Sequence, residues 1–588
     1  MLQDIPKDTY KLLIEQYLPA LELKTLRLVS KECRAFIDTT INALKPRNFS
    51  ECQPGELAKL FENLQHLELR QHPEVAYKDN MSSFEQLTAL RKLKSLKIAG
   101  QGLTGLTTLH YVETRWMKDS QLEPLSSLVN LRELSLRGAV SINGTGLAYL
   151  SGLSHLQSLD ISRCSTMSAE GLNAMAALTQ LTALSASYIG LPTKASPAGI
   201  MGRADNHGIL GLLSCLTGLR KLDLQKSVGR SQSLLDKLAG LTNLTALDIG
   251  FAHYPHPFLS GSAMDGSALL ALRKLRILKA EGWHICFLSG AASSSSSGAA
   301  VMALTELHES TWPHDDGHDG LLQAAVRGGK LTSLELNGRY SPVLMCDNPH
   351  LWAHATSLSR LKFSSCNVQS LSELQRLPKL KSLSFSRCSI SADCEHVVSI
   401  SRLETLHFDE VSDYSHSLAQ ALGRLCTLKS LRIPESTGFG SWLVGNVAQL
   451  TDLQDLDLSN QEDSRGIDKV IRPLSALRQL TSLGLAHLRV NNTGLKAIRN
   501  LKHLRNLSLD GGRFNDKGLR GLTKLTALRS LGLRSCHDIT DEGIRAVVVP
   551  LSQHSLAWLD VTDCERLTDL RTAKGMGVCC AIHSGGHW

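Results

Sequence analysis

Two short clusters combine histidine with acidic or thiol side chains, the residue types that bind metal ions. Residues 314–319 read His-Asp-Asp-Gly-His-Asp, and residues 579–587 contain two cysteines and two histidines. A zinc site needs four ligands that the fold holds in a tetrahedron. The first cluster has no second ligand group nearby in the sequence, and the second lies in a glycine-rich end. We interpret them as a solvated acidic loop and a terminal tail, and we expect no metal and no cofactor.

Short motifs of the common enzyme classes are missing from the sequence. There is no GxxxxGKS/T phosphate loop, no GxSxG turn and no HExxH pair. The glycines at 438, 440 and 445 lack the spacing of a dinucleotide-binding site. The 14 cysteines include no CxxC pair, which argues against a zinc ribbon or a disulfide scaffold and favours a reducing compartment. We therefore predict that the protein is not an enzyme.

Composition limits the classes of protein that the chain could represent. The 588 residues are 42% hydrophobic and 20% charged, which excludes wholesale disorder. No apolar run approaches the ~18 residues that span a bilayer, and residues 1–4 do not open a secretory signal. The net charge of +8 is small for this length and does not indicate nucleic acid. We expect neither a membrane nor a nucleic-acid partner, and a cytoplasmic location, with the nucleus or the ciliary axoneme as alternatives.

Leucine accounts for 107 residues, and most of this excess belongs to one repeated pattern, Leu-x-x-Leu-x-(Leu/Ile/Phe/Val). Clear copies begin at Leu64, Leu93, Leu131, Leu156, Leu219, Leu244, Leu331, Leu358, Leu380, Leu403, Leu428, Leu453, Leu480, Leu504, Leu528 and Leu556. Weaker copies begin at Leu106, Leu181, Leu275 and Leu304. The mean step of about 26 residues falls in the range of leucine-rich repeats. The chain from residue 64 to 561 therefore resembles the leucine-rich-repeat family.

The repeat dictates a fold because a single copy cannot bury its own leucines. In Leu-x-Leu, both leucines point to one face of a short strand and the middle residue points to the other. Strands stacked ~4.8 Å apart share one apolar interior, which fits an aromatic content of 5%. Segments such as 493–499 and 541–547 place apolar residues at helical spacing. We predict an α/β fold, a right-handed solenoid (horseshoe) with short parallel strands on its concave face and helices on its convex side.

Five cysteines occupy one position of the repeat, three residues after the last apolar residue of the strand. They are Cys164, Cys366, Cys388, Cys536 and Cys564. In the leucine-rich-repeat family this position holds Asn or Cys, whose side chain satisfies backbone groups where the strand turns away. We expect all five to be structural rather than a metal or redox set. Segments such as 536–544 look like the cysteine-containing repeat class that is often found in F-box proteins.

Interruptions of the repeat suggest how the chain is organised. We predict a helical head at 1–47, the solenoid at 48–570 and a flexible tail at 571–588. Proline, glycine or serine interrupt the spacing near 187–212, 250–267 and 283–303, and we interpret these stretches as insertions on the rim, where loops are tolerated. Leu93 and Leu106 are too close for two repeats, so one of these copies is false.

The head resembles an F-box. It carries Ile-Pro at 5–6, Leu-Ile at 13–14, Tyr-Leu at 17–18 and Leu-Arg-Leu-Val-Ser-Lys at 26–31, although its first helix is one residue longer than the family pattern and the usual tryptophan near 33–34 is missing. The resemblance implies docking on the Skp-family adaptor of a cullin ubiquitin ligase. The matching apolar positions are Ile5, Pro6, Leu13, Ile14, Leu18, Leu26 and Val29. The alternative is a helical cap that covers the leucines of the first repeat.

Residues beside the inward leucines should line the concave face and bind a partner. They mix acids, bases and small residues without a continuous basic track or many aromatics, which argues against nucleic acid. We predict partner-binding residues at Arg70, Arg137, Asp160, Lys221, Asp223, Glu335, Lys362, Asp409, Arg432, Asp455, Asp457, Asp510, Arg534 and Asp560. Glu68 and Asp248 add further acids to this face.

A basic residue often follows the first leucine of the pattern. It is present as Lys94, Arg132, Arg220, Arg276, Lys381, Lys429, Arg505 and Arg529. Stacking would align these side chains on one edge of the strands, which we call the cationic edge. One interpretation is a solvated edge whose long side chains cover leucines. The other is an edge that attracts an acidic or phosphorylated partner.

Together, the two resemblances imply a non-enzymatic substrate receptor of an SCF-type ubiquitin ligase. The head would dock the adaptor, and the repeats would hold an unknown protein substrate close to it. The alternative is a leucine-rich-repeat scaffold without a ligase link, similar to repeat proteins that bind cytoskeletal components or the ciliary axoneme.

Overall fold

The computed structural model describes residues 118–189, 207–228, 231–250, 264–287, 301–310, 319–338, 352–368, 371–390, 395–413, 422–435, 446–460 and 467–567, with short strands at 43–44, 66–70, 95–99, 343–344 and 579–581. The chain divides into two compact units. The first comprises Met1–Leu304 and His318–Leu321, and the second comprises Thr305–Gly317 and Leu322–Trp588. The F-box-like residues at 5–31 lie outside the described residues.

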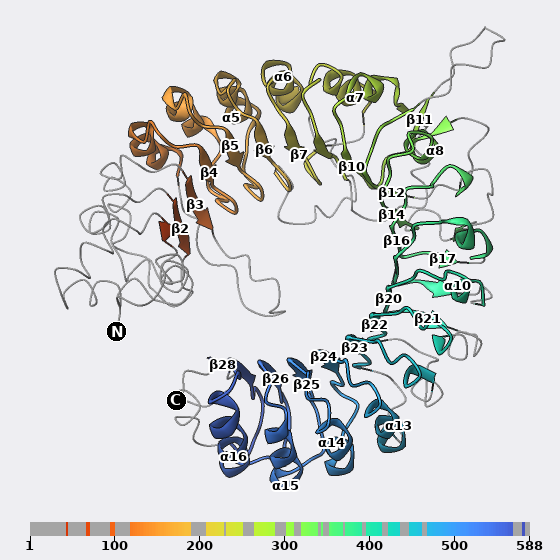
Figure 1. Cartoon of the computed structure of the whole chain (residues 1–588). Coiled ribbons are helices and arrows are strands. Elements are labelled where there is room, and N and C mark those ends of the chain that lie inside the picture. The colour runs from red at the N-terminus through yellow and green to blue at the C-terminus, as the bar shows by residue number, and fades with distance from the viewer. Residues whose placement is uncertain are drawn as a thin grey trace, which may run out of the picture. The chain divides into compact units, whose positions relative to one another are not determined.

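The first unit contains a ladder of parallel strands, one from each repeat (Figure 1). They are β1 (Ala43–Leu44), β2 (His66–Arg70), β3 (Ser95–Ala99), β4 (Glu133–Ser135), β5 (Ser158–Asp160), β6 (Ala183–Ser185), β7 (Lys221–Asp223), β8 (Ala246–Asp248) and β10 (Ile277–Ala280). Leucines stay in register along the ladder, so that Leu134 lies opposite Leu159 and Leu159 opposite Leu184. The copy at Leu93 supplies β3, which pairs directly with β4, and Leu106 lies outside the described residues.

Helical segments connect these strands and lie on the other side of the ladder (Figure 1). They are the 3₁₀ helices η4 (Asp119–Ser127), η5 (Thr145–Gly152), η6 (Met175–Ala177) and η7 (Ser267–Ala271), and the α-helices α5 (Ala169–Ala174), α6 (His207–Cys215) and α7 (Gln232–Leu238). Serine caps begin two of them, because the Ser168 and Ser231 hydroxyls accept hydrogen bonds from the N–H groups of Gly171 and Leu234. A second sheet joins β9 (Met264–Asp265), β11 (Ile285–Phe287) and β13 (Asp319–Gly320).

The second unit repeats the arrangement with a longer described ladder. Its strands are β12 (Glu306–Ser310), β14 (Ser333–Asn337), β16 (Arg360–Ser364), β18 (Ser382–Ser386), β20 (Thr405–Asp409), β22 (Ser430–Arg432), β23 (Asp455–Asp457), β24 (Ser482–Gly484), β25 (Asn506–Ser508), β26 (Ser530–Gly532), β27 (Trp558–Asp560) and β28 (Cys579–Ala581). Each pairs with the next in parallel. This confirms the predicted leucine-rich-repeat solenoid with a parallel sheet. Strand β28 also places residues 579–581, which we assigned to a flexible tail, on the ladder beside β27.

The opposite side of the second unit carries helices and a narrow second sheet. The helices are α8 (Leu321–Arg327), η8 (Ser372–Arg376), α10 (Glu395–Val398), α13 (Ile467–Leu474), α14 (Asn492–Ile498), α15 (Asp516–Leu519), η9 (Arg520–Lys524) and α16 (Asp541–Ser552). The second sheet runs β15 (Val343–Leu344), β17 (Asn367–Val368), β19 (Ser389–Ile390) and β21 (Ser412–Asp413). Asn491 caps α14 by accepting the N–H groups of Thr493 and Gly494. Within each unit the strands therefore face one side, the concave face, and the helices face the other (Figure 1).

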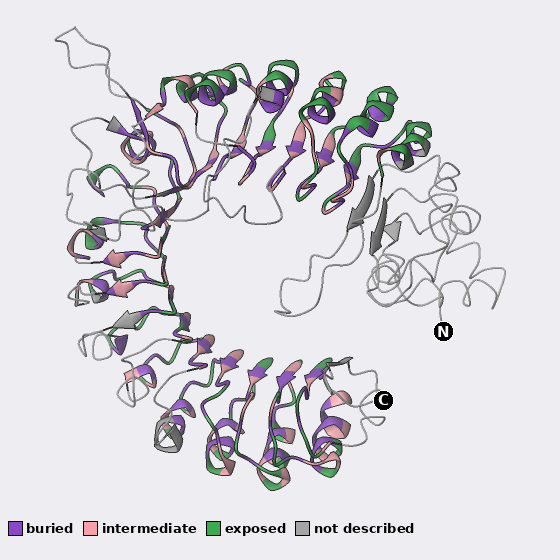
Figure 2. Ribbon diagram, turned by 180° about the vertical axis from the view of Figure 1, so that it is seen from behind, coloured by how far each residue is buried: buried purple, intermediate pink, exposed green. Residues whose placement is uncertain are grey.

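The space between strands and helices is apolar, as the buried segments in Figure 2 show. Leucine fills most inward positions, but the neighbouring strands β16, β18 and β20 carry phenylalanine at the last inward position of the repeat pattern. Phe363, Phe385 and Phe408 are almost fully buried, and their ring centroids stack at 5.4 and 5.3 Å. The repeat pattern allows phenylalanine at this position, and the stacked rings fit because identical rings at one register position align as leucines do.

The five repeat-position cysteines are structural, as predicted. Each is buried, and its thiol donates to a carbonyl of the preceding repeat; the Sγ–O distance is 3.3 Å for Cys164 to Leu136 and 3.0 Å for Cys564 to Leu533. The Cys366, Cys388 and Cys536 thiols reach the Leu336, Phe363 and Leu509 carbonyls in the same way. Burial raises the pKa of Cys164 to about 12, so this thiol is not a reactive thiolate.

Two other residue types occupy the same position with the same hydrogen bond. The Ser227 hydroxyl donates to the Ala186 carbonyl, and the Trp283 indole Nε1–H donates to the Ile249 carbonyl at 2.6 Å. Trp283 is fully buried. Cysteine is therefore one of several side chains that can donate at the point where the strand turns away, whereas apolar residues such as Ala139, Ile189 and Leu488 take this position in other repeats.

A left-handed residue precedes this position in many repeats. Non-glycine residues with φ between 49° and 63° include Arg163, Tyr188, Lys226, Ser365, Arg387, Glu410, Ser535 and Asp563. Glycine takes the same place at Gly138, Gly282 and Gly511. This conformation is strained for residues with a side chain, at a cost of about 1 kcal/mol or more each. The turn geometry is therefore imposed by the stacking of repeats rather than by local preference.

Candidate functional site

Outward residues of the second unit form rows across its strands. One row runs His308, Glu335, Lys362, Ser384, His407, Arg432 and Asp457, because the strand register places each opposite the next. We call it the concave row. Beyond Asp457 the row continues as Gly484, Ser508, Gly532 and Asp560. The charged and histidine side chains are thus concentrated over β12 to β23, and three small residues follow before Asp560.

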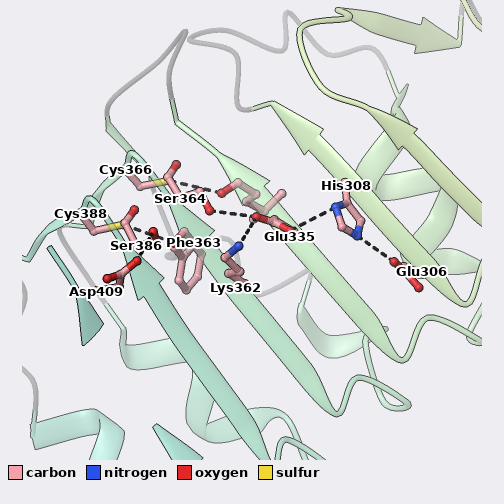
Figure 3. Close-up of polar contacts among 11 residues, drawn as sticks. Glu306, His308, Glu335, Lys362, Phe363, Ser364, Cys366, Ser386, Cys388 and Asp409 are labelled. Atoms are coloured by element: carbon pink, nitrogen blue, oxygen red, sulfur yellow. Dashed lines mark hydrogen bonds and ion pairs between the residues drawn. The ribbon is translucent and has the colours of Figure 1, made fainter. Parts of the chain in front are cut away.

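Glu335 is the centre of a polar cluster on this row (Figure 3). Its Oε1 accepts from the Lys362 ammonium at 2.7 Å and from the Ser364 hydroxyl at 3.0 Å, while its Oε2 lies 3.1 Å from His308 Nδ1. Burial alone would raise the pKa of Glu335, but the hydrogen bonds from His308 and Lys362 and their positive charges lower it to about 2. The carboxylate therefore stays ionised at any physiological pH.

His308 lies between two carboxylates. Its Nε2 is 2.9 Å from Glu306 Oε1, and its Nδ1 faces Glu335. A neutral imidazole has a single N–H, so both contacts are hydrogen bonds only when the ring is protonated. With His308 protonated, the cluster is an alternating row of charge, Glu306, His308, Glu335 and Lys362, held on three adjacent strands (Figure 3).

A second charged pair lies further along the same face. Arg432 Nε is 2.7 Å from Asp455 Oδ2, which also accepts the Ser430 hydroxyl at 2.9 Å. Burial raises the pKa of Asp455, but the hydrogen bonds from Arg432 and Ser430 outweigh it and the net shift is downward. Because the Ser430 hydroxyl proton is donated to Asp455, His407 Nε2–H donates to Ser430 Oγ at 3.0 Å. Burial together with the Arg432 charge lowers the pKa of this histidine.

Carboxylates dominate the corresponding row of the first unit. Asp160, Ser185, Asp223, Asp248 and Lys279 lie opposite one another in that order on β5 to β10. Burial raises the pKa of Asp248 to about 6, an effect that the nearby Asp223 charge reinforces and the Gly250 N–H opposes. Burial likewise raises the pKa of Asp223. These two carboxyls therefore bind protons at a higher pH than ordinary aspartates do.

Several predicted binding aspartates have a structural role as well. The carboxylate of Asp160 accepts the N–H of Ser162 at 2.9 Å, two residues later, where the chain leaves the strand. The same bond, at 3.0 Å, joins Asp223 to Gln225, Asp248 to Gly250, Asp457 to Ser459 and Asp560 to Thr562. Aspartate favours this position because its side chain satisfies a turn N–H. One oxygen of each carboxylate is thus engaged by the fold.

The predicted residues fall into three places on the ladder. Lys221, Glu335, Lys362 and Asp455 lie at the start or middle of strands; Arg70, Asp160, Asp223, Asp409, Arg432, Asp457 and Asp560 end strands; and Arg137, Asp510 and Arg534 lie two residues beyond them. The structure joins Glu335 to Lys362 and Arg432 to Asp455. Arg137, Asp409 and Arg534 are exposed, and the Arg70 side chain lies outside the described residues.

Sequence reasoning missed His308, Glu306 and Ser364, which complete the Glu335 cluster. The signal for His308 was present, since it is the outward residue of the weaker copy that begins at Leu304. Aligning that copy with the next one places His308 opposite Glu335, as β12 and β14 do. A histidine facing a glutamate on adjacent strands is then expected to form an ion pair.

The cationic edge is neutralised in part of the second unit. Glu404 lies between two of its lysines, 2.7 Å from Lys381 Nζ and 2.9 Å from Lys429 Nζ. In the first unit, the Arg276 guanidinium donates to the carbonyls of Arg273, Leu275 and Ala303. Several predicted members of the edge are therefore engaged within the fold, and Lys94 lies outside the described residues.

Comparison with known proteins gives structural similarity only. No family model matches the chain, and no curated protein matches its sequence. A crystal structure of an internalin from Listeria monocytogenes matches with 18% identity and a TM-score of 0.33, covering 64% of this chain and 83% of that one. A TLR13–ssRNA13 complex matches with 17% identity and a TM-score of 0.40, covering 89% of this chain and 66% of that one. The solenoid assignment rests on the ladder itself.

Two further properties concern the described part of the chain. None of its helices is long and apolar enough to cross a bilayer. Within the same residues, no group of three or more His, Cys, Asp or Glu side chains is arranged to hold a metal ion. The histidine cluster at 314–318 lies outside them.

Proposed function

We propose that the chain is a non-enzymatic protein-binding repeat array. The observation that carries the proposal is the contrast between the two faces of one ladder. Inward positions such as Leu334, Leu361 and Leu383 are buried and alike, whereas the outward residues between them change from Glu335 to Lys362. A constant frame with changing outward residues provides an extended surface whose chemistry is specific to this sequence.

The finer proposal is that the array is the substrate receptor of an SCF-type ubiquitin ligase. It is supported by the F-box resemblance of the sequence at 5–31. In this proposal the head docks the Skp-family adaptor, the repeats hold an unknown protein substrate, and proximity alone promotes ubiquitin transfer. A cytoplasmic location follows from this proposal, with the nucleus as an alternative. The second candidate, a scaffold for the cytoskeleton or ciliary axoneme, needs the array without the ligase link.

A co-purification experiment separates the two candidates. The tagged full chain is mixed with purified adaptor, and Leu26→Asp and Val29→Asp are compared with Val129→Asp, which places the same charge on an exposed residue of the array. The receptor proposal expects adaptor binding by the native chain and the Val129 variant, and its loss in both head variants. Native chain that does not bind the adaptor would reject the receptor role and leave the scaffold.

Binding through the concave face has its own test. Lys362→Ala together with Arg432→Ala removes two cations of the concave row, while Lys237→Ala with Lys496→Ala removes two exposed lysines on the helices α7 and α14. A partner identified by proximity labelling should lose affinity for the first variant and retain it for the second. Equal affinity for both would show that the partner binds another surface.

A further inference from the structure

Two consecutive members of the cationic edge, Arg505 and Arg529, lie among further basic residues of the neighbouring turns and have no acidic neighbour in these segments. The turns and strand starts at 474–482, 498–506 and 522–530 contain no Asp or Glu. They carry Arg478, Lys502, Arg505 and Arg529, all exposed. Among the described residues these four have no ion pair. Arg132 and Arg220, the exposed members in the first unit, directly precede β4 and β7, which have two strands between them.

The ladder brings these cations side by side. The Thr481 carbonyl accepts the N–H of Arg505, and the Arg505 carbonyl accepts the N–H of Arg529 at 2.7 Å, so the two arginines lie directly before the adjacent strands β25 and β26. Neighbouring strands lie ~4.8 Å apart, a spacing at which two unpaired cations repel. Bases near helix C-termini, such as Lys524, have a structural explanation in the helix dipole. Arg505 and Arg529 directly precede strands, so the helix dipole does not explain their positions.

An exposed tryptophan adjoins this stretch. Trp558 is 40% exposed at the start of β27, and its backbone N–H donates to the Arg529 carbonyl at 3.0 Å. Strand pairing places it opposite Ser530, the residue that follows Arg529. Exposed tryptophan beside arginine is the composition of binding hot spots. An aromatic anchor and a row of cations thus occupy the same edge.

We propose that this edge, Arg478, Lys502, Arg505 and Arg529 with Trp558, binds an acidic protein segment that carries an apolar side chain. The acidic groups lie against the cations and the apolar side chain packs on the indole. The patch covers only four repeats and has one exposed aromatic ring, whereas single-stranded nucleic acid needs a longer basic groove with several stacking rings. The inference rests on the proposed protein-binding function and assigns the chemistry of the partner.

The test uses the full chain and a labelled glutamate-rich peptide that contains one leucine, with a second peptide in which glutamine replaces every glutamate. The native chain should bind the first peptide, more weakly as salt increases, and should not bind the second. Arg505→Gln with Arg529→Gln should weaken binding at least about tenfold. The matched control, Arg132→Gln with Arg220→Gln, removes the same charge from the same repeat position and should retain binding.

Trp558→Ala should weaken binding of the leucine-containing peptide and leave a leucine-free version unaffected. Equal losses in the two arginine pairs, or affinity that is unchanged by salt, would overturn the proposal. Tighter binding of a single-stranded oligonucleotide, lost in the same variants, would replace the protein segment with nucleic acid. Binding of the native chain to the adaptor is measured in parallel. If the chain binds the peptide but not the adaptor, the ligase role alone is rejected. If it binds the adaptor but not the peptide, the acidic-segment site alone is rejected.

Discussion

Asp223 and Asp248 lie directly opposite each other on β7 and β8, and the protein holds both carboxyls in half-buried positions. Burial raises the pKa of each, that of Asp248 to about 6, and the two charges oppose one another. Each also accepts one turn N–H, which lowers its pKa by less than burial raises it. The concave face of the first unit is therefore destabilised when both ionise.

Replacing Asp248 with asparagine should stabilise the protein at pH 7.5. Because the folded-state pKa of Asp248 is raised to about 6, the folded state binds the proton more tightly than the unfolded chain, and stability falls as pH rises from about 4 to 6. The amide oxygen of the new side chain would still accept the Gly250 N–H, so the gain is on the order of 1–3 kcal/mol. Thermal unfolding of the variant and the native chain at pH 5 and pH 7.5 measures it.

An exposed carboxylate provides the control for that experiment. Asp236→Asn removes one charge from α7 without changing a buried group. We expect it to leave the pH dependence of the native chain intact, whereas Asp248→Asn flattens it. If both variants follow the native profile, Asp248 does not carry the proton that the structure assigns to it.

Glu335→Gln should destabilise the second unit more than Lys362→Gln. Glutamine leaves His308 and Lys362 without their shared anion, and three hydrogen bonds to a charged acceptor are weakened at a cost of about 1–3 kcal/mol. Lys362 is 46% exposed, so losing its charge costs under about 1 kcal/mol. Melting temperatures of the two variants rank the effects. If Lys362→Gln lowers the melting temperature more than Glu335→Gln, the lysine contributes more to the stability of the cluster than the glutamate does.

Acid should erase the Glu335 effect. The folded-state pKa of about 2 lies below the ordinary value of 4.5, so the stabilisation is complete above about pH 4.5 and is lost as the pH falls towards 2. The difference in melting temperature between Glu335→Gln and the native chain should therefore narrow below about pH 4.5. A difference that persists down to pH 2 would mean that packing, not charge, accounts for it.

Trp283→Phe should destabilise the first unit by about 2–4 kcal/mol. The change removes the indole donor to the Ile249 carbonyl and shrinks a fully buried side chain. Trp558→Phe makes the same substitution at an exposed residue and should stay within about 0.5 kcal/mol of the native chain. Urea unfolding followed by circular dichroism compares them. A harmless Trp283→Phe would refute the need for a donor at that turn.

Two glycines should respond in opposite ways to alanine. A Cβ on Gly484 would collide with the Asp457 carboxylate and approach the Ser459 hydroxyl, so Gly484→Ala should cost about 1–3 kcal/mol. A Cβ on Gly521, in η9, meets nothing within 4 Å, so Gly521→Ala should stabilise by about 0.5–1 kcal/mol. Differential scanning calorimetry gives both shifts. Two variants of equal stability would mean that the Asp457 side chain moves aside without cost.

The repeat pattern predicted the ladder because one rule, burial of in-register leucines, sets every strand. Even the weaker copies at Leu181, Leu275 and Leu304 form strands β6, β10 and β12. The pattern missed β28, whose residues are Cys579, Cys580 and Ala581, since it contains no leucine. Strand β1 likewise begins the ladder at residues 43–44, which the sequence placed in the head.

The polar contacts were harder to predict, since they depend on which repeats become neighbours. Glu404 lies 23 residues from Lys381 and 25 from Lys429, and only the stacked strands show that one carboxylate serves both. The sequence also could not show that aspartates such as Asp160 and Asp457 use one oxygen within their own turns. The repeat pattern identified these residues as charged and outward-facing. Their partners depend on which residues of neighbouring strands lie opposite one another.

The parallel ladder also gives the molecule mechanical properties. In the described repeats of each unit, a strand of the ladder pairs only with the strands before and after it, so bending one joint strains two neighbours and leaves distant repeats relaxed. We therefore expect the array to bend elastically, through small changes at each interface between neighbouring repeats. A partner that binds several consecutive repeats restricts their motion relative to one another, and this loss of conformational entropy reduces its binding free energy. Recognition by this array is therefore expected to stiffen it.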